Sequence, residues 1–212
     1  YIIATHLNLM STTPSACVAV VTGTARGIGL EIALRFHAEN YHVILLDNDK
    51  ATLQQCKTNL KGKGNYSFEF CDVSNPRQVQ STFQKILSRF PAIHALINNA
   101  GIAIFKPADQ VTFEDWNAVM STNLNGTFLC TQAALPGLLE AKGSIVNIAS
   151  ISGVRASTLR IAYGTSKAAI MHLTKQQAVE YGNMGVRANA VAPGPVDTEM
   201  AKLVHSADIR TS

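Results

Sequence analysis

The chain has 212 residues, of which 47% are hydrophobic and 15% are charged, which fits one globular domain with a sizeable core. Its formal net charge is +4, and the basic residues are scattered rather than gathered into a stripe, so no nucleic-acid partner is expected. No apolar run reaches the roughly 20 residues that cross a bilayer, which argues against a membrane protein. The four cysteines and six histidines show no metal-ligand spacing, so we predict no metal site and a reducing, cytoplasmic environment.

The first fifteen residues are expected to form a flexible lead-in. Residues 1–9 lack the basic region and the long apolar region of a secretory signal. Met10 and the polar stretch 11–15 have the composition of a natural start, so we expect residues 1–9 to be foreign to the native protein. Residues 16–212 are then expected to form a single domain.

A short apolar run at residues 17–21 predicts a first strand that is buried on both faces of a parallel sheet. The glycine-rich turn 22–29 follows it directly and leads into a predicted helix at residues 30–38. Gly23 and Gly29 have no side chains to obstruct a pyrophosphate that approaches the backbone N–H groups at the helix start. A glycine cluster alone is more often an ordinary turn, but its position after a buried strand favours a dinucleotide site.

Asp47 ends the second predicted strand, residues 41–46, about 20 residues beyond the glycine turn. A carboxylate at this place can accept hydrogen bonds from an adenosine ribose and repels a 2′-phosphate, which favours NAD over NADP. The alternative is that Asp47 is only a turn residue in the sequence Asp-Asn-Asp. Arg26 in the glycine turn could still meet a phosphate.

Polar residues also follow the third and fourth predicted strands, residues 66–71 and 93–97. Asp72 either hydrogen-bonds an adenine amino group or joins Ser74 and Asn75 in capping the next helix, and the sequence favours neither interpretation. The fourth strand ends in the segment 98–101, Asn-Asn-Ala-Gly, whose small and amide residues let the backbone approach a ligand. A plain turn has a similar sequence.

The second half of the chain begins with a long predicted helix, residues 112–139, which holds Asn123 in its middle. Asparagine is a mediocre helix former, so one inside a helix is either exposed or engaged in a hydrogen bond, and by itself Asn123 is expected to be exposed. Ser150 follows the fifth predicted strand, residues 144–149. The sixth strand, residues 186–191, leads into a loop rich in proline and glycine.

Tyr163 and Lys167 lie four residues apart in a second long helix, so their side chains project from the same helix face. An ammonium beside a phenol favours the ionised phenol and prepares the tyrosine to exchange a proton near neutral pH. Tyr-x-x-x-Lys is common on solvent-exposed helices, so the pair carries weight only together with other motifs.

Strands that alternate with helices and end in small or polar clusters predict an α/β fold with a doubly wound parallel sheet and one ligand crevice at its carboxyl edge. The motifs together resemble the short-chain dehydrogenase/reductase family over about residues 17 to 200. The matching segments are Thr22-Gly23-x-x-x-Gly27-x-Gly29, Asn98-Asn99-Ala100-Gly101, Asn123, Ser150, Tyr163-x-x-x-Lys167 and Pro193-Gly194. The resemblance implies a Rossmann-like fold, NAD(P)-dependent interconversion of a secondary alcohol and a ketone, and a homo-oligomer of two or four subunits.

The resemblance also implies roles for individual residues. Tyr163 would be the general acid/base, and Lys167 would hold the ribose hydroxyls and favour the ionised tyrosine. Ser150 would hydrogen-bond the substrate oxygen, and Asn123 would anchor a water that links Lys167 to solvent. The residues implied to bind the cofactor are Gly23, Arg26, Ile28, Gly29, Asp47, Asp72, Val73, Asn99, Tyr163, Lys167, Val196 and Thr198.

Family members usually continue beyond the Pro-Gly loop with a substrate-covering segment and a seventh strand, whereas this chain stops at Ser212. We therefore expect the sheet to lack the usual C-terminal strand. This departure favours the alternative of a non-catalytic cofactor-binding or regulatory protein on the same fold. The presence of Ser150, Tyr163 and Lys167 favours an enzyme.

The sequence does not identify the substrate. Polar residues of the loop before the second long helix hint at a polar substrate such as a sugar or polyol, but they could equally face solvent. These residues are Arg155, Ser157, Thr158 and Arg160.

Overall fold

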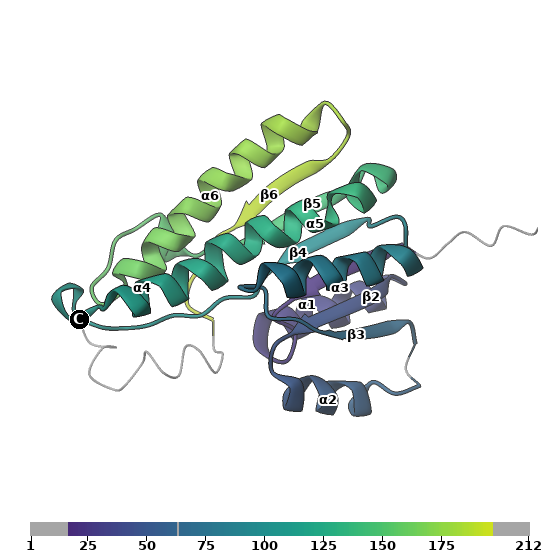
Figure 1. Ribbon diagram of the computed structural model, residues 1–212, viewed down its shortest axis with the longest axis horizontal. Coiled ribbons are helices and arrows are strands. Elements are labelled where there is room, and N and C mark those ends of the chain that lie inside the picture. The colour runs from purple at the N-terminus through teal and green to yellow at the C-terminus, as the bar shows by residue number, and fades with distance from the viewer. Residues whose placement is uncertain (1–16, 63, 197–212) are drawn as a thin grey trace, which may run out of the picture.

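The computed structural model describes residues 17–62 and 64–196, so the predicted flexible lead-in lies outside the described residues. The strands are β1 (Val18–Thr22), β2 (His42–Asp47), β3 (Tyr66–Phe70), β4 (Ala95–Asn98), β5 (Ser144–Ile148) and β6 (Arg187–Val191). They form one parallel sheet in the order β3-β2-β1-β4-β5-β6 (Figure 1). This arrangement confirms the predicted doubly wound sheet, with β6 at one edge of the described part.

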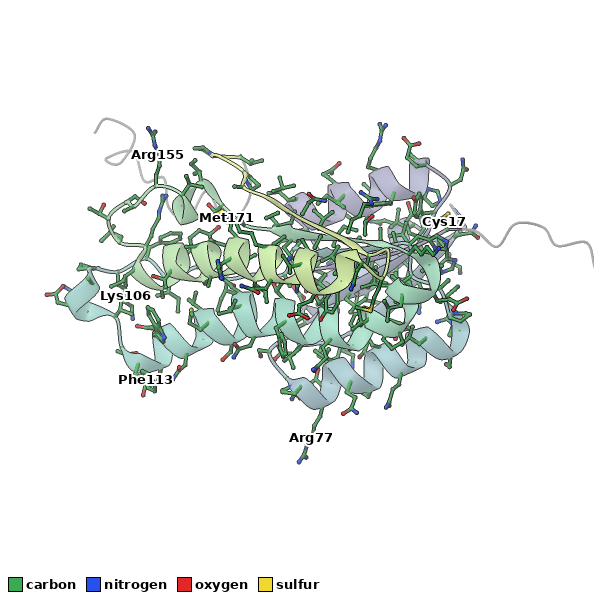
Figure 2. All side chains as sticks on the ribbon, turned by 90° about the horizontal axis from the view of Figure 1, so that it is seen from above. Cys17, Arg77, Lys106, Phe113, Arg155 and Met171 are labelled. Atoms are coloured by element: carbon green, nitrogen blue, oxygen red, sulfur yellow. The ribbon has the colours of Figure 1, made fainter. Side chains whose placement is uncertain are left out.

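Helices cover both faces of the sheet. They are α1 (Gly27–Ala38), α2 (Lys50–Asn59), α3 (Pro76–Arg89), α4 (Phe113–Met120), α5 (Gly126–Ala141) and α6 (Ile161–Gly182). Figures 1 and 2 show α3, α5 and α6 on one side of the sheet and α1 on the other. Among the described helices, none combines the length and the apolar character needed to cross a membrane.

The central strands are buried on both faces, as their continuous apolar runs predict. Val20 and Leu96 are fully buried and belong to the core that packs against α3 and α5. The neighbouring residue Val21 belongs to a second core, which packs against α1 and α2. Because successive side chains of a strand point to opposite faces, the central strands β1, β2 and β4 contribute to both cores, at roughly 1.5–3 kcal/mol for each large apolar side chain.

Side chains define where several helices begin. Asp49 accepts a hydrogen bond from the Thr52 N–H at the start of α2, and Thr112 forms a reciprocal capping box with Asp115 at α4. At α3 the cap is Asn75, which accepts hydrogen bonds from two N–H groups of the first turn.

The capping interpretation is confirmed for Asn75, whereas Asp72 and Ser74 do not cap α3. Pro76 occupies the first helical position, where its fixed φ angle and missing N–H are tolerated, so the capping position is residue 75. The Asp72 carboxylate instead accepts hydrogen bonds from the N–H and hydroxyl groups of Ser74, 2.9 and 2.7 Å away.

A buried polar network ties α6 to the sheet. Asn147 of β5 donates hydrogen bonds to Thr174 and Gln177 of α6, both at 2.8 Å, and accepts one from Asn98 of β4. These side chains are almost inaccessible to solvent. Because each bond has a defined geometry, the network fixes the position of α6 along β5, and with it the positions of the side chains that α6 carries.

The strand order reverses between β1 and β4. Helix α1 leaves β1 toward one face and α5 lies on the other, so the carboxyl ends of β1, β4 and β5 open onto a shared crevice. Open α/β sheets bind ligands in this position.

Candidate active site

The turn after β1 packs so closely that its glycines leave no space for side chains. Gly23 has a φ angle of +69°, in the left-handed region that favours glycine. A Cβ atom on Gly29 would lie 2.1 Å from the Gly23 carbonyl oxygen. Asn99 of the β4 end donates hydrogen bonds to the carbonyl oxygens of Thr22 and Gly23, at 3.0 and 2.9 Å. The turn is therefore compact, and β4 holds it in place.

Asp47 lies at the carboxyl end of β2 and supports the same turn. One carboxylate oxygen accepts a hydrogen bond from the Ala25 N–H, and the other accepts one from the Asp49 N–H, both at 2.8 Å. Each oxygen has a second lone pair that a ribose hydroxyl could use. Arg26 is mostly exposed and lies 3.7 Å from Asp49 in an ion pair.

The Val73 side chain belongs to the hydrophobic core. It is 6% exposed and packs against Gly126 at the start of α5. Asp72 beside it is half-buried and engaged with Ser74. Val73 can therefore meet an adenine only through its backbone groups.

Lys167 is buried at the centre of the crevice. Its side chain is 3% exposed, and its ammonium donates a hydrogen bond to the Ile148 carbonyl oxygen at 2.7 Å. Burial lowers the pKa of Lys167 to about 8, because the charged form loses hydration. Its Nζ atom lies 5.7 Å from the centre of the Tyr163 ring, which confirms that the two side chains share one helix face.

Ser150 follows β5 and faces the same crevice. Its hydroxyl oxygen accepts a hydrogen bond from the Ser152 N–H at 3.2 Å in the short helix η3 (Ile151–Gly153). The hydroxyl hydrogen is then free to donate to another acceptor. The Ile151 N–H donates to the Pro193 carbonyl oxygen, so the loop after β6 closes over this turn.

Asn123 is fully buried, so the expectation that it is exposed was wrong. The predicted long helix is interrupted by a π-helical turn, η2 (Ser121–Asn125), between α4 and α5. This turn directs the Asn123 amide to the backbone of Ile102, with hydrogen bonds of 2.8 and 3.0 Å, and to the Ser166 hydroxyl at 2.9 Å. A Cβ on Gly101 would lie 3.1 Å from the Asn123 amide oxygen and 3.5 Å from the Lys167 Nζ, so both groups border the Gly101 backbone.

A cavity of about 190 Å³ brings part of the predicted set together. Its lining includes Ile28, Asn99, Ser150, Tyr163, Lys167 and Val196. The other predicted residues with described positions do not line it: Gly23, Arg26, Gly29, Asp47, Asp72, Val73 and Asn123. Thr198 lies outside the described residues. Three of the four catalytic candidates, Ser150, Tyr163 and Lys167, thus converge, while the adenosine-side candidates lie along the turns after β1, β2 and β3.

Two further residues of the cavity wall, Phe105 and Arg160, stand out. Phe105 carried no sequence signal, because it lies in a loop without a motif. Arg160 precedes α6 and was one of four loop residues that hinted at a polar substrate. The other three, Arg155, Ser157 and Thr158, are exposed and do not line the cavity.

A second hollow of about 450 Å³ lies between α3 and α5. Its lining consists of apolar and glutamine side chains, with no titratable or nucleophilic group. Although it is larger, it holds no residues for chemistry. In the described part of the chain, no three histidine, cysteine, aspartate or glutamate side chains gather as a metal site.

The comparisons with known proteins agree with this geometry. The model of the short chain dehydrogenase family matches residues 17–208. The chain is 35% identical over 185 residues to D-threitol dehydrogenase from Mycolicibacterium smegmatis, covering 86% of this chain and 71% of that protein. It is 39% identical over 191 residues to 2-(R)-hydroxypropyl-CoM dehydrogenase from Xanthobacter autotrophicus, covering 87% and 76%.

Comparison with solved structures also finds similar proteins, among them a reductase. A structure described as "ElxO with NADP Bound" superposes with a TM-score of 0.83 at 34% identity, covering 89% of this chain and 77% of that one. Levodione reductase superposes with a TM-score of 0.84 at 33% identity, covering 89% and 75%. The chain therefore belongs to the short-chain dehydrogenase/reductase family, whose members are hydride-transferring oxidoreductases.

Proposed function

We propose that this chain interconverts a secondary alcohol and a ketone with NAD(H) as the cofactor, and that Tyr163 is the general acid/base. The observation that carries the proposal is the convergence of Ser150, Tyr163 and Lys167 on one cavity at the carboxyl edge of the sheet. Each group has a distinct capacity there: a hydroxyl hydrogen to donate, a phenol to exchange a proton, and a buried ammonium.

The crevice fits a nicotinamide dinucleotide. A side chain on Gly29 would fill the space beside Gly23, and no side chain caps the start of α1, so its N–H groups remain available to a pyrophosphate. We assign cofactor binding to the following residues: Gly23, Arg26, Ile28, Gly29, Asp47, Asp72, Val73, Asn99, Tyr163, Lys167, Val196 and Thr198. When bound, the cofactor supplies or accepts the hydride.

The preference for NAD rests on Asp47. Its carboxylate lies at the end of β2 beside the glycine turn, and a 2′-phosphate on the ribose would meet its negative charge. One solved relative is described with NADP bound, and Arg26 offers a positive charge in the same turn. Arg26 is already paired with Asp49, which weakens its attraction for a phosphate.

The side chains of the cavity transfer a proton to the substrate oxygen and stabilise the charge that develops on it. In the direction of reduction, Tyr163 would donate its hydroxyl proton to the carbonyl oxygen of the substrate. The Ser150 hydroxyl donates a hydrogen bond to the same oxygen and stabilises the negative charge that develops on it. The Lys167 ammonium stabilises the tyrosinate that is left, and Asn123 holds the backbone beside Lys167 and anchors the water that returns the proton.

The substrate class follows from the wall of the cavity and from relatives. The cavity is small and partly polar, and one relative is named for a polyol, D-threitol. We propose a small polar alcohol or ketone, with sugars and polyols among the candidates.

We also propose a cytoplasmic homo-oligomer, a dimer or a tetramer. Large apolar side chains lie exposed on the outer helices, including Phe113 of α4, Phe128 of α5 and Val179 of α6, the last with 78% of its surface exposed. Association between copies of the chain would cover such side chains.

The test is Tyr163→Phe, which removes one hydroxyl group and keeps the ring. We expect kcat for ketone reduction to fall about 10²–10⁴-fold, because the proton donor is lost. NADH affinity should stay near that of the unmodified protein in a fluorescence titration. The matched control is Tyr181→Phe on the same helix, which should keep its activity. Retained turnover in Tyr163→Phe would refute the proposed role.

A further inference from the structure

One wall of the cavity carries a positive charge that the proposed chemistry does not use. Arg160 lines the cavity together with Ser150, Ser152 and Tyr163. Arg155 belongs to the same loop but is exposed, and its side chain points away from the molecule (Figure 2). The loop therefore directs one arginine toward the site and leaves the other in solvent.

The Arg160 guanidinium is held in a defined orientation. It lies over the Phe105 ring, with its central carbon 5.6 Å from the ring centre, and its Nη1 donates a hydrogen bond to the Ser152 hydroxyl at 3.3 Å. Phe105 also packs against the Tyr163 ring, with 6.3 Å between the ring centres. The aromatic ring thus links the guanidinium to the catalytic tyrosine, and little side-chain entropy would be lost when a ligand binds.

No carboxylate balances this charge in the described part of the cavity. The lining contains two cationic side chains, Arg160 and Lys167, and no aspartate or glutamate. Lys167 is already engaged with the Ile148 carbonyl oxygen. The ion pairs within the described residues use other basic groups: Arg26, Arg35, Lys85, Arg89 and Lys106. The guanidinium has donors left over, because it has five N–H groups.

We propose that the substrate carries an oxyanion, a carboxylate, sulfonate or phosphate, which Arg160 and Ser152 bind while its carbonyl group lies at Ser150 and Tyr163. This inference rests on the proposed function and narrows it to anionic alcohols and ketones. A planar guanidinium donates paired hydrogen bonds to such groups, and a partly enclosed cavity strengthens them relative to open solvent.

The first test compares two ketones of nearly equal shape, acetoacetate and its amide, acetoacetamide. The unmodified protein should have the higher kcat/KM for acetoacetate. In Arg160→Gln the ratio of the two kcat/KM values should fall about 10- to 100-fold, the range expected for loss of one or two charge-assisted hydrogen bonds. Arg155→Gln makes the same change of charge in the same loop and should leave the ratio as it was. Arg160→Lys, which keeps the charge but not the fork of donors, should fall between the two.

The second test does not depend on turnover. Acetate, methanesulfonate and methyl phosphate are each added to the protein with NADH, and the melting temperature is compared with that in acetamide. At least one of these anions should raise the melting temperature in the unmodified protein and in Arg155→Gln, but not in Arg160→Gln. The anion with the largest effect identifies the kind of oxyanion.

The outcomes separate this inference from the proposed function. Turnover with an acetoacetate preference that survives in Arg160→Gln would overturn the anion site and leave the reaction intact. Stabilisation by an anion that requires Arg160, without turnover of either ketone, would support the site and exclude these two ketones as substrates. Equal effects of the anions on all variants would overturn the inference whether or not either ketone is reduced.

Discussion

Replacing Lys167 by methionine tests the electrostatics of the site through its effect on stability. The ammonium is almost completely buried, and burial brings its pKa from the ordinary 10.5 to about 8. At 1.36 kcal/mol for each pKa unit, this difference corresponds to a cost of about 3 kcal/mol for keeping Lys167 charged in the folded protein. The cost is fully present below pH 8, where the lysine is protonated in both the folded and the unfolded chain.

Raising the pH relieves this cost. Between the folded pKa of about 8 and the ordinary 10.5, the unfolded chain binds more protons than the folded protein, so the free energy of unfolding rises with pH. Relative to Lys167→Met, the unmodified protein should gain about 2 kcal/mol in its free energy of unfolding between about pH 7.5 and 9.5. The lost hydrogen bond to Ile148 shifts the stability of the variant equally at both pH values and does not affect this gain.

The assay is urea unfolding followed by circular dichroism at the two pH values. Lys175→Met is the matched control, because Lys175 lies on the same helix but is exposed, and this variant should follow the pH dependence of the unmodified protein. The reasoning is refuted if Lys167→Met shows the same rise with pH as the unmodified protein and Lys175→Met.

Two further substitutions test the cofactor crevice. Asp47→Ser removes the charge expected beside the ribose, so the ratio of NADPH to NADH affinity should rise about tenfold or more in fluorescence titrations; an unchanged ratio would show that Asp47 does not select the cofactor. Gly29→Ala places a Cβ 2.1 Å from the Gly23 carbonyl oxygen and should lower both the melting temperature and NADH affinity. The control Gly182→Ala adds a Cβ to open space in α6 and should stabilise the protein by up to about 1 kcal/mol, so similar effects of the two would contradict the tight packing of the glycine turn.

The sheet could be predicted from sequence because its strands are buried on both faces. The apolar runs that contain Val20 and Leu96 have no polar face, as a parallel sheet covered by helices requires. The glycine turn was predictable for a related reason, since close approach between Gly23 and Gly29 excludes any side chain. In both cases a local packing constraint restricts the residue types at particular positions, so it can be recognised in the sequence.

Asn123 shows where local reasoning fails. Helix propensity describes an isolated helix and favours an exposed asparagine, whereas tertiary contacts decided its position. The partners of its amide, Ile102 and Ser166, lie 21 and 43 residues away in the sequence, and a π-helical turn directs the side chain toward them. Neither the π-helical turn nor these distant partners can be recognised from the periodicity of the sequence.

The residues that line the cavity wall could not be predicted from the local sequence either. Arg155 and Arg160 have the same chemistry in one loop, and only the fold distinguishes the one in solvent from the one in the cavity. Phe105 contributes through its position between Arg160 and Tyr163, which depends on how the loop after β4 packs against the start of α6. Such contacts join segments that are distant in sequence.

The most direct test of the account follows the hydride itself. The purified protein is incubated with NADH that carries deuterium at C4 of the nicotinamide ring and with a panel of neutral and anionic ketones, and the alcohols formed are analysed by mass spectrometry and NMR. We expect deuterium on the carbinol carbon of at least one product, and about 10²–10⁴-fold slower formation of that product with Tyr163→Phe. Tight binding of NADH without transfer of deuterium to any ketone would contradict the account and indicate a cofactor-binding protein.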